Sequence, residues 1–270
     1  MSKINLIQRA SVVVRTTFRV PEFGMNEFDP LSWASGTMLS STSEKFPRRC
    51  HILVNSHVVL PWQHLGMYTP EQAEWLQHVD SKHCMYELQI VDDQGGVLVS
   101  SSAGAVRRAP GSRDLAAMYL LNESLFHDTL TDKGVQLLTP DLNHDLTPDV
   151  ILEIPGHEAE GTLLTPLLVE AALQCRTEHQ TFLKTARLLP QGMCGAPVLL
   201  QNSTCCGIID GIVPEFNLDD DRGGENEKQR ELRRLLSGSA SMIPAHELAT
   251  FVQYLEHTDD SLTAELVRAT

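Results

Sequence analysis

The residues with the clearest chemical potential lie in residues 189–200, which read LPQGMCGAPVLL. Here Cys194 stands in a short run of small residues that precedes an apolar strand. Small residues on both sides allow the backbone to turn sharply and a substrate carbonyl to come close. In such a turn the amides of Gly192 and Cys194 can point together and stabilise an oxyanion. The alternative is a structural cysteine in a Gly-Pro turn, since free cysteine is among the most buried residue types.

Two further residues could act together with this cysteine. Residues 54–59 (VNSHVV) place His57 at the end of an apolar strand, and residues 113–120 place Asp114 just before another one. Taken alone, the first is typical of a core histidine and the second of a turn or cap residue. Together with Cys194 they follow the order His, Asp, Cys along the chain, separated by 57 and 80 residues. Acyl transfer can be carried out by three such residues when a fold brings them together: a histidine as base, an aspartate that orients it, and a cysteine as nucleophile.

The elements that must position these residues are mostly short strands. Turns rich in Gly, Pro, Asp and Ser separate apolar runs, and residues 92–96 (DDQGG) are a hairpin signal between two such runs. Many short strands at this spacing predict barrels or a sandwich. The runs cover residues 11–14, 36–39, 51–54, 86–91, 97–100, 115–121, 150–154, 198–200 and 207–213.

Helical patterns are fewer. Residues 70–79 begin with Pro and Glu and indicate an inserted helix. Residues 244–257 carry one apolar stripe, formed by Leu248, Phe251, Val252 and Leu255, which predicts a helix packed on a core. Residues 215–234, dense in acids and then in bases, are typical of a solvated loop or a short exposed helix, with a docking surface as the alternative.

Composition excludes several classes of protein. The chain has 270 residues, 42% of them hydrophobic and 21% charged, which is typical of a globular protein rather than a disordered one. A net charge of −14 opposes a phosphate backbone, so we expect no nucleic acid as a partner. No apolar run reaches the roughly 18–20 residues that span a bilayer, so we expect no membrane span.

The cysteines and histidines indicate neither disulfides nor a metal site. Six cysteines are scattered without a CxxC pair, and the histidines show no HExxH spacing. No P-loop or GxGxxG fingerprint is present either, so we expect no cofactor and no metal. Reduced thiols indicate an intracellular protein, with the cytoplasm favoured. The basic residues before position 20 would also suit a mitochondrial presequence, whereas residues 10–18 (ASVVVRTTF) favour a first β-strand.

Four short motifs in order resemble one known family. They are residues 35–39 (SGTML), 55–59 (NSHVV), 113–116 (RDLA) and 192–197 (GMCGAP), and residues 242–244 (MIP) lead into the final helix. Over roughly residues 10–256 the chain resembles the chymotrypsin/trypsin-like peptidase superfamily, clan PA, and within it the HtrA (Deg) branch most. The resemblance implies an all-β fold of two six-stranded antiparallel β-barrels with a C-terminal helix. Residues 1–125 would form the barrel with His57 and Asp114, residues 126–256 the barrel with Cys194 and the helix, and residues 257–270 a tail.

The resemblance also implies an activity. The protein would be a cysteine endopeptidase that cleaves polypeptides, with Cys194 as nucleophile, His57 as base and then acid, and Asp114 holding the imidazole. The amides of Gly192 and Cys194 would form the oxyanion hole. Residues lining the substrate cleft would be Leu188, Leu189, Ile209, Asp210 and Gly211. An apolar floor made by the two leucines favours an apolar substrate side chain, although both could simply pack inside the second barrel.

The chain departs from the family pattern around the nucleophile. Cys194 replaces the usual serine, Met193 replaces a polar residue, and Ala196 replaces a glycine. Asp210 stands where a small residue is common, which would bring a second carboxylate close to Asp114. These departures leave a second hypothesis open, in which a degenerate protease keeps the fold as a binding or scaffolding module.

Overall fold

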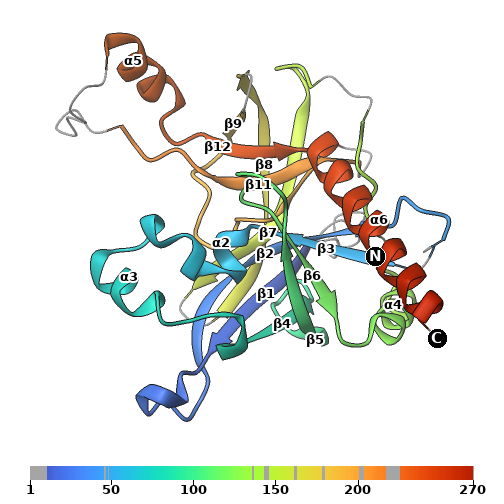
Figure 1. Cartoon of the computed structure of the whole chain (residues 1–270). Coiled ribbons are helices and arrows are strands. Elements are labelled where there is room, and N and C mark those ends of the chain that lie inside the picture. The colour runs from blue at the N-terminus through green and yellow to red at the C-terminus, as the bar shows by residue number, and fades with distance from the viewer. Residues whose placement is uncertain are drawn as a thin grey trace.

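Two closed antiparallel β-barrels make up most of the computed structural model (Figure 1). The structure describes residues 11–45, 47, 49–135, 137–142, 146–160, 163–177, 180–200, 204–216 and 226–269. Each barrel has six strands, and a C-terminal helix follows the last strand. The predicted fold class is therefore confirmed, and this double barrel fits a chymotrypsin-like fold.

The N-terminal barrel runs in the order β1-β2-β3-β6-β5-β4. Its interior side chains alternate along the strands, as the two-residue period of a β-strand requires. In β1, for example, Val12 and Val14 join the core of this barrel, whereas Val13 lies outside it against Leu164 of the other barrel. The six strands are β1 (Ser11–Phe18), β2 (Asp29–Ser40), β3 (Cys50–Val54), β4 (Cys84–Val91), β5 (Val97–Arg108) and β6 (Ala116–Leu120).

The C-terminal barrel runs in the order β10-β11-β12-β9-β8-β7. Its longest pair is the hairpin of β7 and β8, whose ten paired positions extend from Ile151 to Glu160. The six strands are β7 (Ile151–Glu160), β8 (Leu163–Arg176), β9 (Thr181–Thr185), β10 (Pro197–Leu200), β11 (Cys205–Ile212) and β12 (Ala240–Pro244).

Helices lie in the connections and at the C-terminal end. A capping box of Thr69 and Gln72, with Pro70 as its first residue, starts α3 (Pro70–Leu76). The other α-helices are α2 (Ser56–Val59), α4 (Glu123–Asp132), α5 (Glu227–Leu236) and α6 (Ala245–Ala269). Short 3₁₀ helices are η1 (Pro21–Phe23), η2 (Pro61–Gln63), η3 (Leu65–Met67) and η4 (Ser81–His83). Among the described residues, no helix is long and apolar enough to cross a membrane.

The C-terminal helix covers the seam between the barrels. Figure 1 shows α6 leaving β12 of the C-terminal barrel and running alongside the N-terminal barrel toward α4. All four residues of its predicted apolar stripe are buried. They belong to one apolar cluster that contains residues of both barrels. These are Leu39 and Leu53 of the N-terminal barrel and Leu199 and Ile208 of the C-terminal barrel. The predicted packing of this stripe is confirmed.

Most predicted elements are present, with informative exceptions. Each of the nine apolar runs overlaps one strand, and three of them extend one residue beyond it at one end or both. Residues 10–18 contain β1, and the hairpin at Asp92 closes through a hydrogen bond from the Asp92 amide to the Gly96 carbonyl. The strands β8, β9 and β12 and the helices α2 and α4 were not expected from the sequence. Of residues 215–234, residues 217–225 lie outside the described part, and the rest includes the start of the exposed helix α5.

Candidate active site

His57 lies at the start of a helix rather than at the end of a strand. β3 ends at Val54, and α2 begins at Ser56, so the chain changes direction just before the histidine. Val58 and Val59 are buried in the core of the N-terminal barrel, which fixes the helix against it. The sequence interpretation of this position as a strand end is therefore wrong by three residues, because the four residues of α2 are too few to show a helical period.

Asp114 accepts three hydrogen bonds from the first turn of α2. Its Oδ1 atom accepts from the Ser56 hydroxyl at 2.7 Å and from the His57 amide at 2.8 Å, and its Oδ2 atom is bonded to His57 Nδ1. Burial by itself raises the pKa of Asp114, but the hydrogen bonds from His57 and Ser56 and the charge of His57 lower it to about 2. Asp114 is therefore ionised at neutral pH.

The ring of His57 connects this carboxylate to the cysteine. Its Nδ1 atom is bonded to Asp114, and the ring interacts electrostatically with Cys194, which lines the same pocket. Because Nδ1 is occupied, Nε2 is the ring nitrogen that remains for another partner. Burial by itself lowers the pKa of His57, but the interactions with Asp114 and Cys194 outweigh burial and raise that pKa to about 10. His57 therefore carries a proton at neutral pH.

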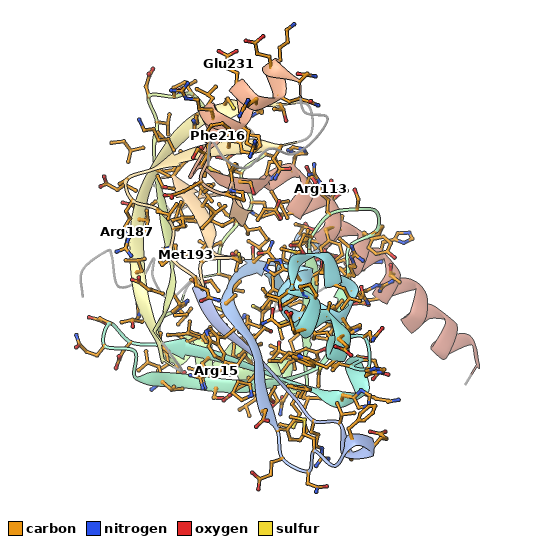
Figure 2. The ribbon with its side chains drawn as sticks, turned by 90° about the vertical axis from the view of Figure 1, so that its left-hand side faces the viewer. Arg15, Arg113, Arg187, Met193, Phe216 and Glu231 are labelled. Carbon is orange, nitrogen blue, oxygen red and sulfur yellow. The ribbon has the colours of Figure 1, made fainter. Side chains whose placement is uncertain are left out.

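The turn that presents Cys194 is held by both barrels. The amide and the hydroxyl of Ser35, on β2, donate to the Gly192 carbonyl at 2.8 and 2.9 Å, and the Thr37 hydroxyl donates to the Gly195 carbonyl at 2.8 Å. Met193 is buried in the core of the C-terminal barrel, in the middle of the molecule where the two barrels meet (Figure 2). An apolar anchor thus holds the turn at the position where the family pattern has a polar residue.

Two glycines in this turn have backbone conformations that other residues avoid. Gly192 has φ +101° and Gly195 has φ +81°, and a Cβ atom added to them would lie 2.6 Å from the His157 carbonyl oxygen and 2.3 Å from the Ser35 carbonyl oxygen. In the described part of the chain, the amides of Gly192 and Cys194 donate to no protein acceptor. Both amides are thus available to an oxyanion.

Asp210 lies near Asp114, with an asparagine between them. The Asn55 side-chain amide donates to the Asp114 carbonyl at 3.0 Å and to Asp210 Oδ1 at 3.4 Å, and Gln180 donates to Asp210 Oδ2 at 2.9 Å. Burial, followed by the charge of Asp114, raises the pKa of Asp210, although the bond from Gln180 opposes this. The second carboxylate is therefore held close to the first without a direct contact to His57.

The other predicted cleft residues lie in different surroundings. Leu189 and Ile209 are buried in the core of the C-terminal barrel together with Met193, whereas Leu188 is 52% exposed. Gly211 continues β11 as a partly exposed residue. The pocket that contains His57 and Cys194 is lined by none of these four.

Three further side chains support the site, and the sequence analysis assigned no role to them. The Ser56 hydroxyl has one hydrogen, which it donates to Asp114, so the bond of 2.8 Å between Ser56 Oγ and His64 Nε2 has His64 as donor. The rings of His64 and His57 meet edge to face, with centroids 6.3 Å apart. The Tyr68 hydroxyl donates to the His57 carbonyl at 3.1 Å. Only the nearness of Ser56 to His57 in sequence was a usable signal.

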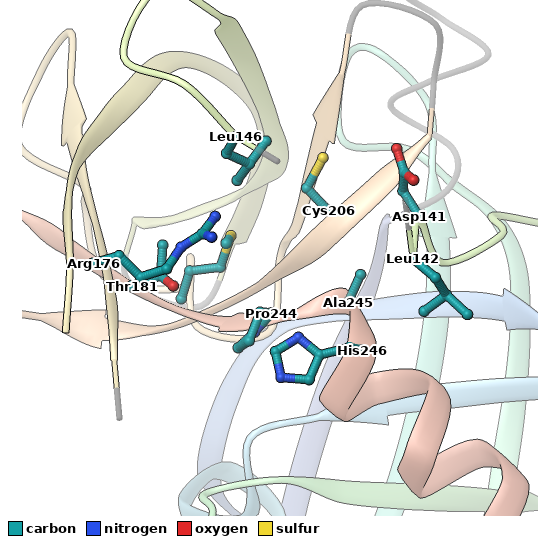
Figure 3. Close-up of a pocket in the computed structure, with 10 residues that line it drawn as sticks. Asp141, Leu142, Leu146, Arg176, Thr181, Cys206, Pro244, Ala245 and His246 are labelled. Carbon is teal, nitrogen blue, oxygen red and sulfur yellow. The ribbon is translucent and has the colours of Figure 1, made fainter. Parts of the chain in front are cut away.

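A second pocket also contains a cysteine, a histidine and an aspartate, but its chemistry is different. Cys206, Asp141 and His246 line a pocket where the C-terminal barrel meets the start of α6 (Figure 3). The sulfur of Cys206 points away from the ring of His246 in this view. Burial, followed by the charge of Asp141, raises the pKa of Cys206 to about 11. Cys206 is therefore a protonated thiol, without the imidazolium that Cys194 has beside it.

Neither of these pockets contains a metal site. Within the part of the chain that the structure describes, no group of three or more His, Cys, Asp or Glu side chains is arranged to hold a metal ion. All six cysteines are free thiols. A comparison of the chain with models of known protein families and with curated proteins found no match.

Proposed function

We propose that the protein is a cysteine endopeptidase of the chymotrypsin-like superfamily, clan PA, with most similarity to its HtrA branch. The observation that carries this proposal is the His57 ring, which is bonded to Asp114, interacts with Cys194 and lines the same pocket as that cysteine. The polypeptide substrate would enter this pocket. No cofactor or metal takes part in the proposed reaction.

In the first step Cys194 would attack the peptide carbonyl. The sulfur forms a bond to the carbonyl carbon, and the π electrons move to the oxygen, which the amides of Gly192 and Cys194 stabilise. Since His57 already holds a proton at neutral pH, it works as the partner of a thiolate rather than as a base that must first take the thiol proton. Asp114 keeps the imidazolium charged and correctly oriented.

In the second step the carbon–nitrogen bond breaks, and His57 Nε2 gives its proton to the leaving amine. The product is a thioester on Cys194. A water molecule then attacks this thioester and gives one proton to His57, while the carbon–sulfur bond breaks and the acid product leaves with the thiolate restored. Every proton taken up by His57 is thus returned within one cycle.

The test is hydrolysis of a peptide library by the wild type and by Cys194→Ala. We expect the wild type to cleave a subset of peptides and Cys194→Ala to fall to background, while Cys175→Ala, which removes another partly exposed thiol, keeps full activity. A thiol-directed probe should label Cys194 in the wild type and lose that site in the variant. If hydrolysis is unchanged in Cys194→Ala, or if no peptide is cleaved, the binding or scaffolding hypothesis replaces this one.

We further propose an intracellular location, with the cytoplasm favoured over mitochondria. A reducing compartment would keep the six free thiols reduced, and the proposed nucleophile depends on this. Fractionation of cells that express the tagged chain tests the location, and recovery from an organelle fraction would contradict the cytoplasm.

A further inference from the structure

The pocket beside Cys194 has apolar walls. It has a volume of about 360 Å³, within the range of about 300–1,000 Å³ that ligand pockets occupy. Of the described residues that line it, none is Asp, Glu, Lys or Arg. Its apolar lining comes from β2, from α2 and from the segment after α2, and consists of Leu31, Trp33, Ala34, Val58, Met67 and Tyr68. The uncharged polar residues Ser32, Gln72 and Gln191 also line it.

The position of His57 on the wall of this pocket indicates which part of the substrate enters it. In the proposed reaction the leaving amine receives its proton from His57 Nε2, so the chain that departs must begin next to this ring. His57 and Val58 line the pocket, whereas Asp114 and Asp210, on the other side of the imidazole, do not. The pocket therefore lies where the leaving part of the substrate begins.

The two leucines predicted as the floor of the pocket for the acyl part of the substrate do not form a cavity together. Leu189 is 3% exposed and packs against Met193 in the barrel core, whereas Leu188 is 52% exposed and does not line the pocket beside Cys194. A substrate side chain that needs burial finds an apolar cavity on the leaving side instead. Its burial there would supply binding energy in proportion to the apolar area removed from water.

We propose that this pocket binds the substrate residue immediately after the scissile bond and selects a large, uncharged, apolar or aromatic side chain there. This inference rests on the proposed cysteine peptidase activity. It places the main selectivity of the enzyme in the leaving group. Trp33 and Met67 would be specificity-determining residues, the first within the wall and the second, 62% exposed, at the rim.

Capture of the thioester by amino-acid amides tests the proposal directly. An N-acetyl amino-acid 4-nitrophenyl ester acylates Cys194, and an added amine then attacks the thioester carbon, loses one proton to His57 and displaces the thiolate. The ratio of amide product to acid product reports how well the amine side chain occupies the leaving-group pocket. We expect leucinamide and phenylalaninamide to exceed glycinamide by at least about 10-fold, since even one methylene in an apolar pocket is worth about 10-fold.

Matched variants assign the preference to the pocket. Trp33→Ala should bring the ratio for leucinamide against glycinamide close to one, and Met67→Glu should raise argininamide above leucinamide. Met85→Glu makes the same charge change on β4, at a residue that is 53% exposed and does not line the pocket, and should leave every ratio unchanged. Circular dichroism spectra of all variants establish that they are folded.

The outcomes separate the two proposals. If intact-protein mass spectrometry detects no thioester with any ester, the proposed activity fails, and the pocket assignment fails with it. If the thioester forms but all amines compete equally, only the pocket assignment is overturned. It is also overturned if Trp33→Ala and Met67→Glu alter the preference among acyl groups and leave the preference among amines unchanged.

Discussion

At the scale of single residues, the charges of His57 and Asp114 link the candidate site to the stability of the fold. The pKa of His57, about 10, lies above its ordinary value of 6.5, so the pair stabilises the fold fully below about pH 6.5 and less as the pH rises toward 10. The pKa of Asp114, about 2, lies below its ordinary value of 3.8, so this contribution is present above 3.8 and is lost as the pH falls toward 2.

The first prediction follows from the directions of these two pKa shifts. The free energy of unfolding lost in His57→Gln should be largest between about pH 4 and 6.5 and should shrink steadily toward pH 10. Urea denaturation of the wild type and the variant at a series of pH values measures this difference. A difference that stays constant from pH 5 to pH 9 would show that the pair is not charged as described.

A second prediction concerns the hydroxyl that supports Asp114. Ser56→Ala removes one of three hydrogen bonds to the carboxylate, and a bond to a charged group is worth about 1.5–3 kcal/mol. We expect the acid limb of the profile of kcat/KM against pH to move to higher pH, and Ser56→Thr to restore it because the hydroxyl is kept. A simple loss of stability would lower activity without moving the limb, which would argue against this role.

Only some residues of the candidate site could be predicted from the sequence. His57, Asp114 and Cys194 were predicted as site residues because each stands in a short motif, and the fold brings the three residues close together. Neither the bond between His64 and Ser56 nor that between Asn55 and Asp210 could be found in this way. Such contacts depend on how α2 leaves β3 and how the two barrels dock, and a local pattern contains neither.

At the scale of elements, strands with a clear apolar pattern were predicted and strands with a helical composition were not. β1 is rich in Val and Thr, which favour strands, whereas β8 contains Leu, Ala, Glu and Gln, which favour helices. β8 is nevertheless a strand because it pairs with β7 on one side and β9 on the other. Tertiary pairing therefore outweighs the local preference of this segment.

The turn around Cys194 leads to a third prediction. Gly192→Ala should abolish peptide hydrolysis, because the added Cβ would meet the His157 carbonyl and displace the amide proposed to hold the oxyanion. Gly24→Ala is the matched control, since Gly24 also has a positive φ, +81°, but has no atom within 4 Å of an added Cβ. This control should keep full kcat/KM. Equal activity of the two variants would contradict the proposed oxyanion hole.

The attachment of α6 leads to a fourth prediction. Glu256 accepts hydrogen bonds from the side chains of Ser41, Thr42 and His51, at 2.6, 2.7 and 2.9 Å, so it fixes the helix to the N-terminal barrel. Glu256→Ala leaves the buried His51 ring and the hydroxyls of Ser41 and Thr42 without this acceptor and should reduce the free energy of unfolding by about 1.5–3 kcal/mol, the value of a hydrogen bond to a charged group. Gln253→Ala, on the exposed face of the same helix, should change it by less than about 0.5 kcal/mol. Urea denaturation of both variants and the wild type measures these two changes in the free energy of unfolding.

At the scale of the whole molecule, the two barrels share buried contacts instead of standing apart. One apolar cluster contains residues of both barrels and of α6, and Ser35 and Thr37 of the first barrel hold the Cys194 turn of the second. We keep the division into residues 1–125 and 126–256, with 257–270 as a tail, as a proposal about chain organisation. The structure continues α6 through this tail to Ala269, so the helix is longer than the predicted residues 244–257. The sequence shows no repeat between the halves, so the similarity of the barrels lies in their topology.

The fifth prediction is that the two barrels unfold together. All three tryptophans, Trp33, Trp62 and Trp75, belong to the N-terminal half, so tryptophan fluorescence reports on that half and far-ultraviolet circular dichroism on the whole chain. Because the shared cluster must be broken for either barrel to open, we expect both signals to change at the same urea concentration.

A substitution in the C-terminal barrel makes this prediction sharper. Leu199 is fully buried in the shared cluster, and Leu199→Ala should cost about 2–5 kcal/mol and shift the fluorescence transition, although every tryptophan lies in the other half. Leu235→Ala, at an exposed position on α5, should leave the transition in place. If Leu199→Ala shifts only the circular dichroism signal, the barrels unfold independently. The candidate site between them would then depend on docking of two separately stable units.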